Sequence, residues 1–174
     1  MTEQLSIKIL RDKKSYKYKR FPNKKDDWFN NDDNNMLDDF ILFAEEDRIF
    51  SAKVQTVANI PFGRFLDTIM PGEFDIKLFV ENRKFYGDIH GICNCFDFEN
   101  QRIDENSVQK NDATRWLVHD TQSLKPKPAM LVTRVAWSAG CFIMSSSNLN
   151  AFSRIVKAFK YNPGEFIHGI LEDK

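Results

Sequence analysis

Residues 74–81 read Phe-Asp-Ile-Lys-Leu-Phe-Val-Glu, and apolar and polar side chains largely alternate along this stretch. Alternation with a period of two is typical of a β-strand that buries one face. The four residues before it, Met70-Pro71-Gly72-Glu73, place Pro and Gly in the order that a type II turn favours, so they predict a turn ahead of the strand.

The rest of the chain predicts more strands and one convincing helix. Segments rich in β-branched and aromatic residues predict strands at 49–57, 84–92, 115–119, 130–137 and 165–171. Ser146 or Ser147 is expected to cap a helix whose apolar face is formed at spacings of three and four by Leu149, Phe152, Val156 and Phe159. The sequence therefore predicts one mainly-β domain over residues 1–174, a β-sandwich or barrel, with one or two helices.

Composition limits the classes of function. The 174 residues are 42% hydrophobic and include 25 basic and 25 acidic side chains, so the net charge is zero. A chain of this length buries roughly 70% of the surface that it exposes when unfolded, enough for a core without disulfides or metal ions. Zero net charge provides no overall field to attract nucleic acid, and no apolar run reaches the roughly 18 residues of a membrane span. We expect neither a nucleic-acid partner nor a membrane span.

Charge is nevertheless distributed unevenly. Residues 11–25 hold eight basic side chains and one acid, whereas residues 26–47 hold nine acids and no base. Such blocks are usually solvated faces, and two of opposite sign can neutralise each other across a hairpin. The alternative for Asp32-Asp33-Asn34-Asn35 is a calcium loop, but the glycine and the twelfth-position glutamate of an EF-hand are missing. A loop over residues 23–35 is the preferred interpretation.

The segment Trp137-Ser138-Ala139-Gly140-Cys141 indicates chemistry. A cysteine after two small residues, between a strand and a helix, lies where the backbone turns tightly and main-chain N–H groups can stabilise a thiolate or an oxyanion. A cysteine nucleophile needs a base, and His119 ends the predicted strand at 115–119. An antiparallel return through residues 130–137 would bring His119 alongside Cys141. The alternative is a buried structural cysteine and a structural histidine.

This pattern resembles the catalytic signature of the L,D-transpeptidases, cysteine enzymes that remodel peptidoglycan. In that family a histidine is followed after 14 to 17 residues by Ser/Thr-His-Gly-Cys and a hydrophobic residue. The flanks of His119 and Cys141 are similar as well, as are the strands at 69–76 and 165–170, so the resemblance covers roughly residues 65–174. Residues 1–60 match only loosely and are interpreted as a divergent or accessory part.

Two departures from the family pattern bear on activity. The family's second histidine, directly before Gly-Cys, is Ala139 here, and the spacer between His119 and Ser138 has 18 residues. The resemblance implies that Cys141 is the nucleophile and His119 the base, with Gly140 and Cys141 N–H groups holding the oxyanion. Ser138, Ala139 and Asp120 are supporting candidates, and the backbone carbonyl of His119 or its neighbour Asp120 would orient the imidazole. No cofactor is implied.

Other candidate residues have simpler interpretations. His90, Cys93 and Cys95 are zinc-ligand types, but a Cys-x-Cys pair on one strand has an unsuitable geometry and no fourth ligand is evident, so we expect a packed strand and no metal. His90, Trp116 and Trp137 are weak candidates for the lining of a substrate groove. His168 is expected on the surface, and three cysteines predict no disulfide framework.

The resemblance implies acyl transfer on L,D-linked peptidoglycan stem peptides, with an amine acceptor for transpeptidation or water for carboxypeptidase or endopeptidase activity. The N-terminal residues lack the apolar stretch of a secretory signal, so we expect synthesis in the cytoplasm. Two alternatives follow: delivery by another route, such as a phage lysis or injection apparatus or a specialised secretion system, or a substrate in the cytoplasm. The alternative, with Ala139 as a sign of lost activity, is a non-catalytic binding or assembly module, again with a possible phage connection. The sequence leaves the oligomeric state open.

Overall fold

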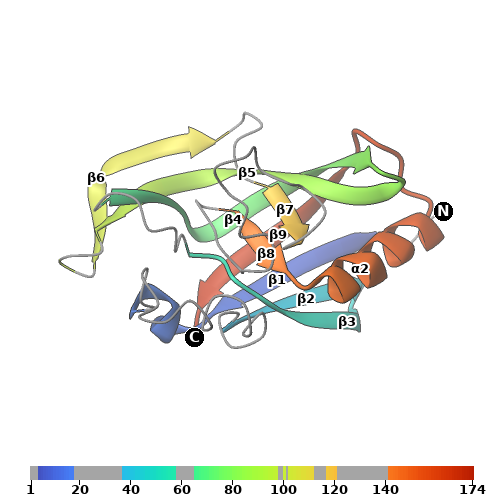
Figure 1. Cartoon of the computed structure of the whole chain (residues 1–174), viewed down its shortest axis with the longest axis horizontal. Helices are drawn as coiled ribbons and strands as arrows, with labels where there is room; N and C mark the ends of the chain where they lie inside the picture. Colours follow the sequence, from blue (N-terminus) through green and yellow to red (C-terminus); the bar gives the residue numbers. More distant parts are fainter. Residues whose placement is uncertain are drawn as a thin grey trace.

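The alternating stretch that begins at Phe74 belongs to the longest strand of the computed structural model, which describes residues 4–17, 37–57, 65–97, 100, 102–111, 117–120 and 141–174. In these residues nine strands form one sheet, in the order β3-β2-β1-β9-β4-β5-β7-β8, with β6 paired to β5 (Figure 1). The elements are β1 (Leu5–Arg11), a 3-10 helix (Lys13–Lys17), β2 (Asp38–Ala44), β3 (Asp47–Val54), β4 (Phe65–Glu81), β5 (Lys84–Asp97), β6 (Arg102–Asn111), β7 (Leu117–Asp120), β8 (Phe142–Met144), α2 (Ser146–Ala158) and β9 (Phe166–Asp173).

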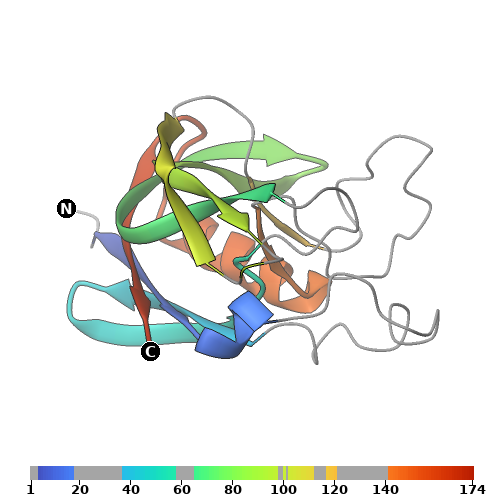
Figure 2. The ribbon, with the colours of Figure 1, turned by 90° about the vertical axis from the view of Figure 1, so that its left-hand side faces the viewer.

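The sheet curls until its two edges meet. After β3, the backbone N–H of Gln55 donates to the carbonyl of Ile143 in β8 at 2.8 Å, and Ile143 N–H donates back to the Gln55 carbonyl at 2.9 Å. This single bridge joins the first and last strands of the order, so the sheet is a nearly closed barrel (Figure 2). The prediction of a mainly-β domain is confirmed, and so are the strands expected near 49–57, 84–92 and 165–171.

The turn predicted at residues 70–73 is wrong. These residues lie inside β4, where the register with β5 shifts between Ile69 and Phe74. Gly72 has φ of 132°, a value that favours glycine. The Pro-Gly pair therefore bends a continuous strand through a bulge and does not end one.

Strands from the N-terminal part of the chain belong to the same sheet. β1 pairs in parallel with β9 and antiparallel with β2, which in turn pairs with β3. β2 lies within the acidic block, yet Phe40, Leu42 and Ala44 are buried. The strand begins with two acidic residues, at 38 and 39, so the charge pattern of the sequence did not indicate its buried apolar face.

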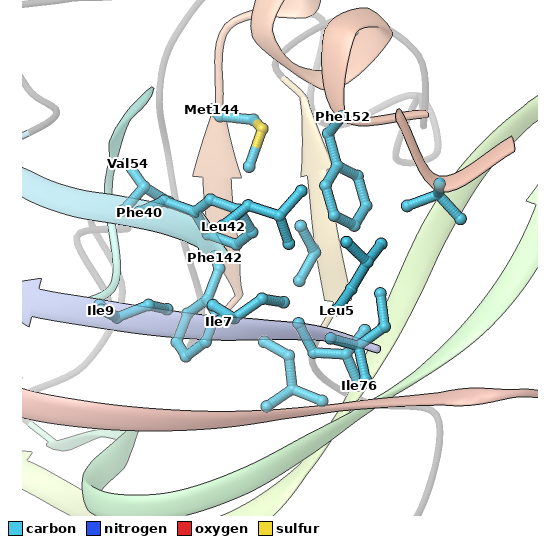
Figure 3. Close-up of a cluster of buried hydrophobic side chains, with 14 of the residues drawn as sticks. Leu5, Ile7, Ile9, Phe40, Leu42, Val54, Ile76, Phe142, Met144 and Phe152 are labelled. Carbon is cyan, nitrogen blue, oxygen red and sulfur yellow. The ribbon is translucent and has the colours of Figure 1, made fainter. Parts of the chain in front are cut away.

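Helix α2 packs its apolar face onto the core at one end of the barrel, as the two views of Figures 1 and 2 agree. Leu149, Phe152 and Val156 are buried, and the Phe152 ring meets Phe40 edge-on with 5.7 Å between centroids (Figure 3). The helix is confirmed, but its cap is Ser145, whose Oγ accepts the N–H of Asn148, and not Ser146 or Ser147.

Two sequence predictions fall outside the described residues, namely the strand at 130–137 and the loop that includes Asp32 to Asn35. Among the helices that the structure describes, none has the length and apolar character needed to cross a membrane.

Candidate functional site

Of the two predicted dyad residues, His119 lies in β7 and Cys141 directly precedes the neighbouring strand, β8. β7 runs parallel to β8, with Val118 opposite Phe142 and His119 opposite Ile143. Strand side chains alternate between faces, and opposite residues share a face. Val118 and Phe142 belong to the main core, whereas Ile143 packs with Cys141 in a separate cluster. His119 and Ile143 therefore share the face turned away from the barrel core, and Cys141, which also packs against the main core, contacts Ile143 on that face.

His119 lies one strand across and two residues along from Cys141, which corresponds to roughly 8 Å between their Cα atoms. From the sequence, His119 and Cys141 were also expected to lie close together, but through an antiparallel return of residues 130–137. Those residues are not described, and the pairing that joins the two strands is parallel.

The thiol of Cys141 is partly buried beside the end of β7. The main-chain N–H of Leu117 donates to its Sγ at 3.3 Å. Burial raises the pKa of the Cys141 thiol to about 11, and the Leu117 N–H opposes that rise only in part. Cys141 is therefore protonated at neutral pH.

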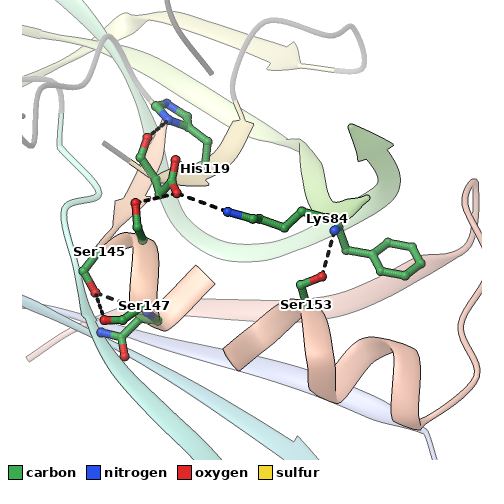
Figure 4. A network of polar contacts seen from close by, with 9 residues as sticks. Lys84, His119, Ser145, Ser147 and Ser153 are labelled. Atoms are coloured by element: carbon green, nitrogen blue, oxygen red, sulfur yellow. Dashed lines mark hydrogen bonds and ion pairs between the residues drawn. The ribbon is translucent and has the colours of Figure 1, made fainter. Parts of the chain in front are cut away.

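His119 is held in one tautomer. Its Nδ1 lies 2.7 Å from the carbonyl oxygen of Asp120, which can only accept, so Nδ1 bears the proton and Nε2 keeps a lone pair (Figure 4). The residue is 8% exposed, and this burial lowers the pKa of His119 against the opposing effect of the Asp120 carbonyl and carboxylate. The imidazole is thus neutral at neutral pH, with Nε2 able to accept a proton.

The Asp120 carboxylate links three elements behind this histidine. Its fully buried side chain accepts a hydrogen bond from Ser146 Oγ at 2.8 Å, and Lys84 Nζ lies 3.7 Å away (Figure 4). The contacts join β7 to the first residue of α2 and the first residue of β5. From the sequence, Ser146 was considered only as a possible helix cap. Lys84 was missed because nothing in the residues around it indicates a contact with Asp120.

The remaining predicted residues divide into two groups. Trp116, Trp137, Ser138, Ala139 and Gly140 lie outside the described residues. The His90 ring meets Phe166 of β9 edge-on with 5.6 Å between centroids, so it leans toward β9, whereas β7 pairs with the other edge of β5. His168 is exposed on β9, with Nδ1 3.0 Å from Asp75 and Nε2 3.5 Å from Glu73.

Within the described part of the chain, no group of three or more His, Cys, Asp or Glu residues could hold a metal ion. The side chains of Cys93 and Cys95 are outside this statement. What the site offers is a thiol, a lone pair on an imidazole nitrogen and a main-chain N–H at the sulfur, which are the components of nucleophilic catalysis by cysteine.

Comparison with known proteins finds a relative of this chain. No family model and no solved structure matches it. It is similar to an uncharacterized protein of Treponema pallidum (strain Nichols), with 34% identity over 186 aligned positions that cover 99% of this chain and 82% of the Treponema protein. The alignment covers nearly the whole chain. The chain therefore belongs to the same family as this Treponema protein.

Proposed function

We propose that this protein is a cysteine-dependent enzyme that transfers the acyl group of peptidoglycan stem peptides, with Cys141 as nucleophile and His119 as base. The observation that supports it is the shared outer face of β7 and β8, where Cys141 and a His119 with its proton on Nδ1 lie one strand apart. The resemblance of residues 65–174 to L,D-transpeptidases supports the choice of substrate.

The protonation states define the first step. Because the thiol and the imidazole are both neutral at rest, His119 Nε2 takes the thiol proton as Sγ attacks the peptide carbonyl. The carbonyl oxygen becomes an oxyanion, held by N–H groups near Gly140 and Cys141. Collapse breaks the C–N bond, the leaving amine takes the proton from His119, and a thioester remains on Cys141.

The second step regenerates the thiol. An acceptor amine or water loses a proton to His119 and attacks the thioester carbonyl, and the departing Cys141 sulfur takes that proton back. The Leu117 N–H stabilises the sulfur anion whenever it forms, because it already points at Sγ. An amine acceptor gives a crosslinked peptide, and water gives a carboxylic acid.

The direct test is incubation of the purified protein with disaccharide tetrapeptides and pentapeptides from bacterial cell walls, analysed by mass spectrometry. We expect crosslinked or shortened products with the wild type, none with Cys141→Ala, and a rate about 10² to 10⁴ lower with His119→Ala. An identical product profile for the wild type and Cys141→Ala would contradict the enzyme proposal.

A second candidate is a module that binds such peptides without cleaving them. The observation in its favour is the raised pKa of Cys141, since a thiol protonated at neutral pH is a poor nucleophile without its base. Binding of the same muropeptides, measured by calorimetry, with equal affinity for the wild type and Cys141→Ala and no turnover in either, would favour this module.

A further inference from the structure

Two buried oxygen atoms lie near the Cys141 and His119 pair without a hydrogen-bond donor. They are Oε1 of Gln55, a residue with 0% exposure, and Oδ1 of Asp88, a residue with 6% exposure. Buried acceptors are nearly always paired in folded proteins because leaving one unpaired costs free energy. An unpaired acceptor beside a candidate active site therefore indicates a donor that arrives with a ligand.

Gln55 and His119 lie at the same level of the barrel, on either side of Ile143. Its backbone exchanges two hydrogen bonds with Ile143, and Ile143 is also the register partner of His119. Residues opposite each other in a sheet project to the same side. The Gln55 side chain thus lies on the outer face that holds Cys141 and His119, separated from His119 by Ile143.

The Gln55 amide has a defined orientation. Nε2 donates to the carbonyl of Val57 at 2.7 Å, and exchanging the amide oxygen and nitrogen would set two acceptors against each other, so the assignment of Oε1 is fixed. The Gln55 strand runs antiparallel to β8, so Val57 lies toward the Cys141 end of β8. The hydrogen bond to Val57 therefore directs the Gln55 amide toward the end of β8 at which Cys141 lies.

Asp88 presents the second acceptor from the opposite side. It is the register partner of Leu117, whose N–H donates to Cys141 Sγ, so its carboxyl group lies on the same outer face. Burial raises the pKa of Asp88, although His90 and Lys77 oppose this rise. Asp88 thus adds a buried acceptor two strands across from Cys141, on the β5 side of the site.

We infer that Gln55 is a substrate-binding residue whose Oε1 accepts a hydrogen bond from a peptide N–H beside the carbonyl that Cys141 attacks. This inference rests on the proposed function, which it deepens by stating what the site recognises. On binding, the unpaired acceptor gains its donor from the peptide N–H. A site of this kind rejects an analogue without the N–H, because the buried acceptor then stays unpaired.

Two small electrophiles test the inference on the intact protein. Chloroacetamide has N–H donors and N,N-dimethylchloroacetamide has none, while both alkylate a thiol by the same displacement of chloride. The ratio of their rates at Cys141, measured by peptide mass spectrometry at pH 9, is compared with the ratio for N-acetylcysteine. We expect the protein to exceed N-acetylcysteine by roughly threefold to tenfold in this ratio, the effect of one hydrogen bond.

Variants locate the effect. Gln55→Met should lower the ratio to that of N-acetylcysteine. Thr68→Val is the matched control, since Thr68 Oγ1 is also buried and without a hydrogen-bond partner but lies on β4 opposite residue 94, and this variant should keep the wild-type ratio. If Gln55→Met does not fold, a wild-type ratio equal to that of N-acetylcysteine still overturns the inference.

The outcomes separate this inference from the proposed function. If both reagents label Cys141 but the ratio equals that of N-acetylcysteine, or survives Gln55→Met, the role of Gln55 is overturned while the enzyme proposal stands. If neither reagent labels Cys141 in the folded protein and both label it after denaturation, the thiol does not meet small electrophiles, and both proposals fall.

Discussion

The main-chain N–H of Leu117 donates to the Sγ of Cys141 at 3.3 Å and so continues the β7–β8 ladder through a side chain. This contact follows from the fold, because the parallel pairing of Val118 with Phe142 positions Leu117 and Cys141. One N–H donor does not offset the loss of water around the sulfur, and the pKa of Cys141 stays near 11.

Alkylation of Cys141 should therefore depend steeply on pH. Only the thiolate attacks an alkyl halide, so the rate with iodoacetamide should rise about tenfold per pH unit from pH 7 and level off near pH 11. Quenched-flow labelling with mass spectrometry measures this profile, and N-acetylcysteine provides the reference. A plateau below pH 8 would mean that the thiolate is stabilised far more than the described contacts account for.

The pKa of His119 should respond in opposite directions to changes at Asp120 and Lys84. The Asp120 carboxylate raises the pKa of His119, so Asp120→Asn should lower it while keeping the carbonyl that accepts from Nδ1. Lys84 Nζ offsets that carboxylate from 3.7 Å, so Lys84→Met should raise the pKa of His119. NMR titration of the ring protons measures both shifts. Shifts of the same sign would contradict the described network.

Much of the fold could be predicted from local pattern, because β4 and α2 each bury one face and their sequences repeat accordingly. The bulge at Gly72 could not, since Pro-Gly serves a turn and a bent strand equally well. Strand β2 could not be predicted, for another reason. Its acidic start dominates the charge pattern, while its burial depends on pairing with β1, a contact between distant segments.

The candidate site was predictable to a different extent. Residue type led to Cys141 and His119 as candidates, and in the structure the main-chain carbonyl of Asp120 accepts from His119 Nδ1. Lys84 and Gln55 were missed because their proximity arises only when β5 pairs with β7 and the barrel closes at Ile143. The spacing of residues along the sequence gives no indication of such contacts.

Capping of α2 provides a stability prediction. Ser145 Oγ accepts the Asn148 N–H, one of the donors that a helix start leaves unpaired. Ser145→Ala should lower the free energy of unfolding by about 1 kcal/mol, measured by urea denaturation. Arg154→Ala is the control, because Arg154 is exposed and lies within the helix away from its start, and it should change stability by less than about 0.5 kcal/mol. Equal losses would argue against Ser145 as the cap.

Asp38 holds the end of β3 through a buried polar network. Its Oδ1 accepts from Asp12 N–H at 2.7 Å and from Ser15 Oγ at 2.5 Å, and its Oδ2 accepts from the N–H and Oγ1 of Thr56 at 3.1 and 2.5 Å. The buried Arg11 Nε donates to the same Thr56 Oγ1 at 2.9 Å. The network fixes the residue that directly follows Gln55.

Asp38→Ala should therefore weaken both the domain and the closure of the barrel. Removing the carboxylate leaves the buried N–H of Thr56 and the part-buried N–H of Asp12 without their acceptor and takes away a negative charge that Arg11 faces, so we expect a loss of about 3 to 5 kcal/mol in the free energy of unfolding. Ser15→Ala removes a single donor and should cost about 1 kcal/mol. Native-state hydrogen exchange should also show faster exchange of the Gln55 and Ile143 amides in Asp38→Ala than in Ser15→Ala, because these two amides form the closing bridge. If the two amides exchange at the wild-type rate while stability falls, then the Asp38 network stabilises the domain but does not hold the bridge beside Cys141.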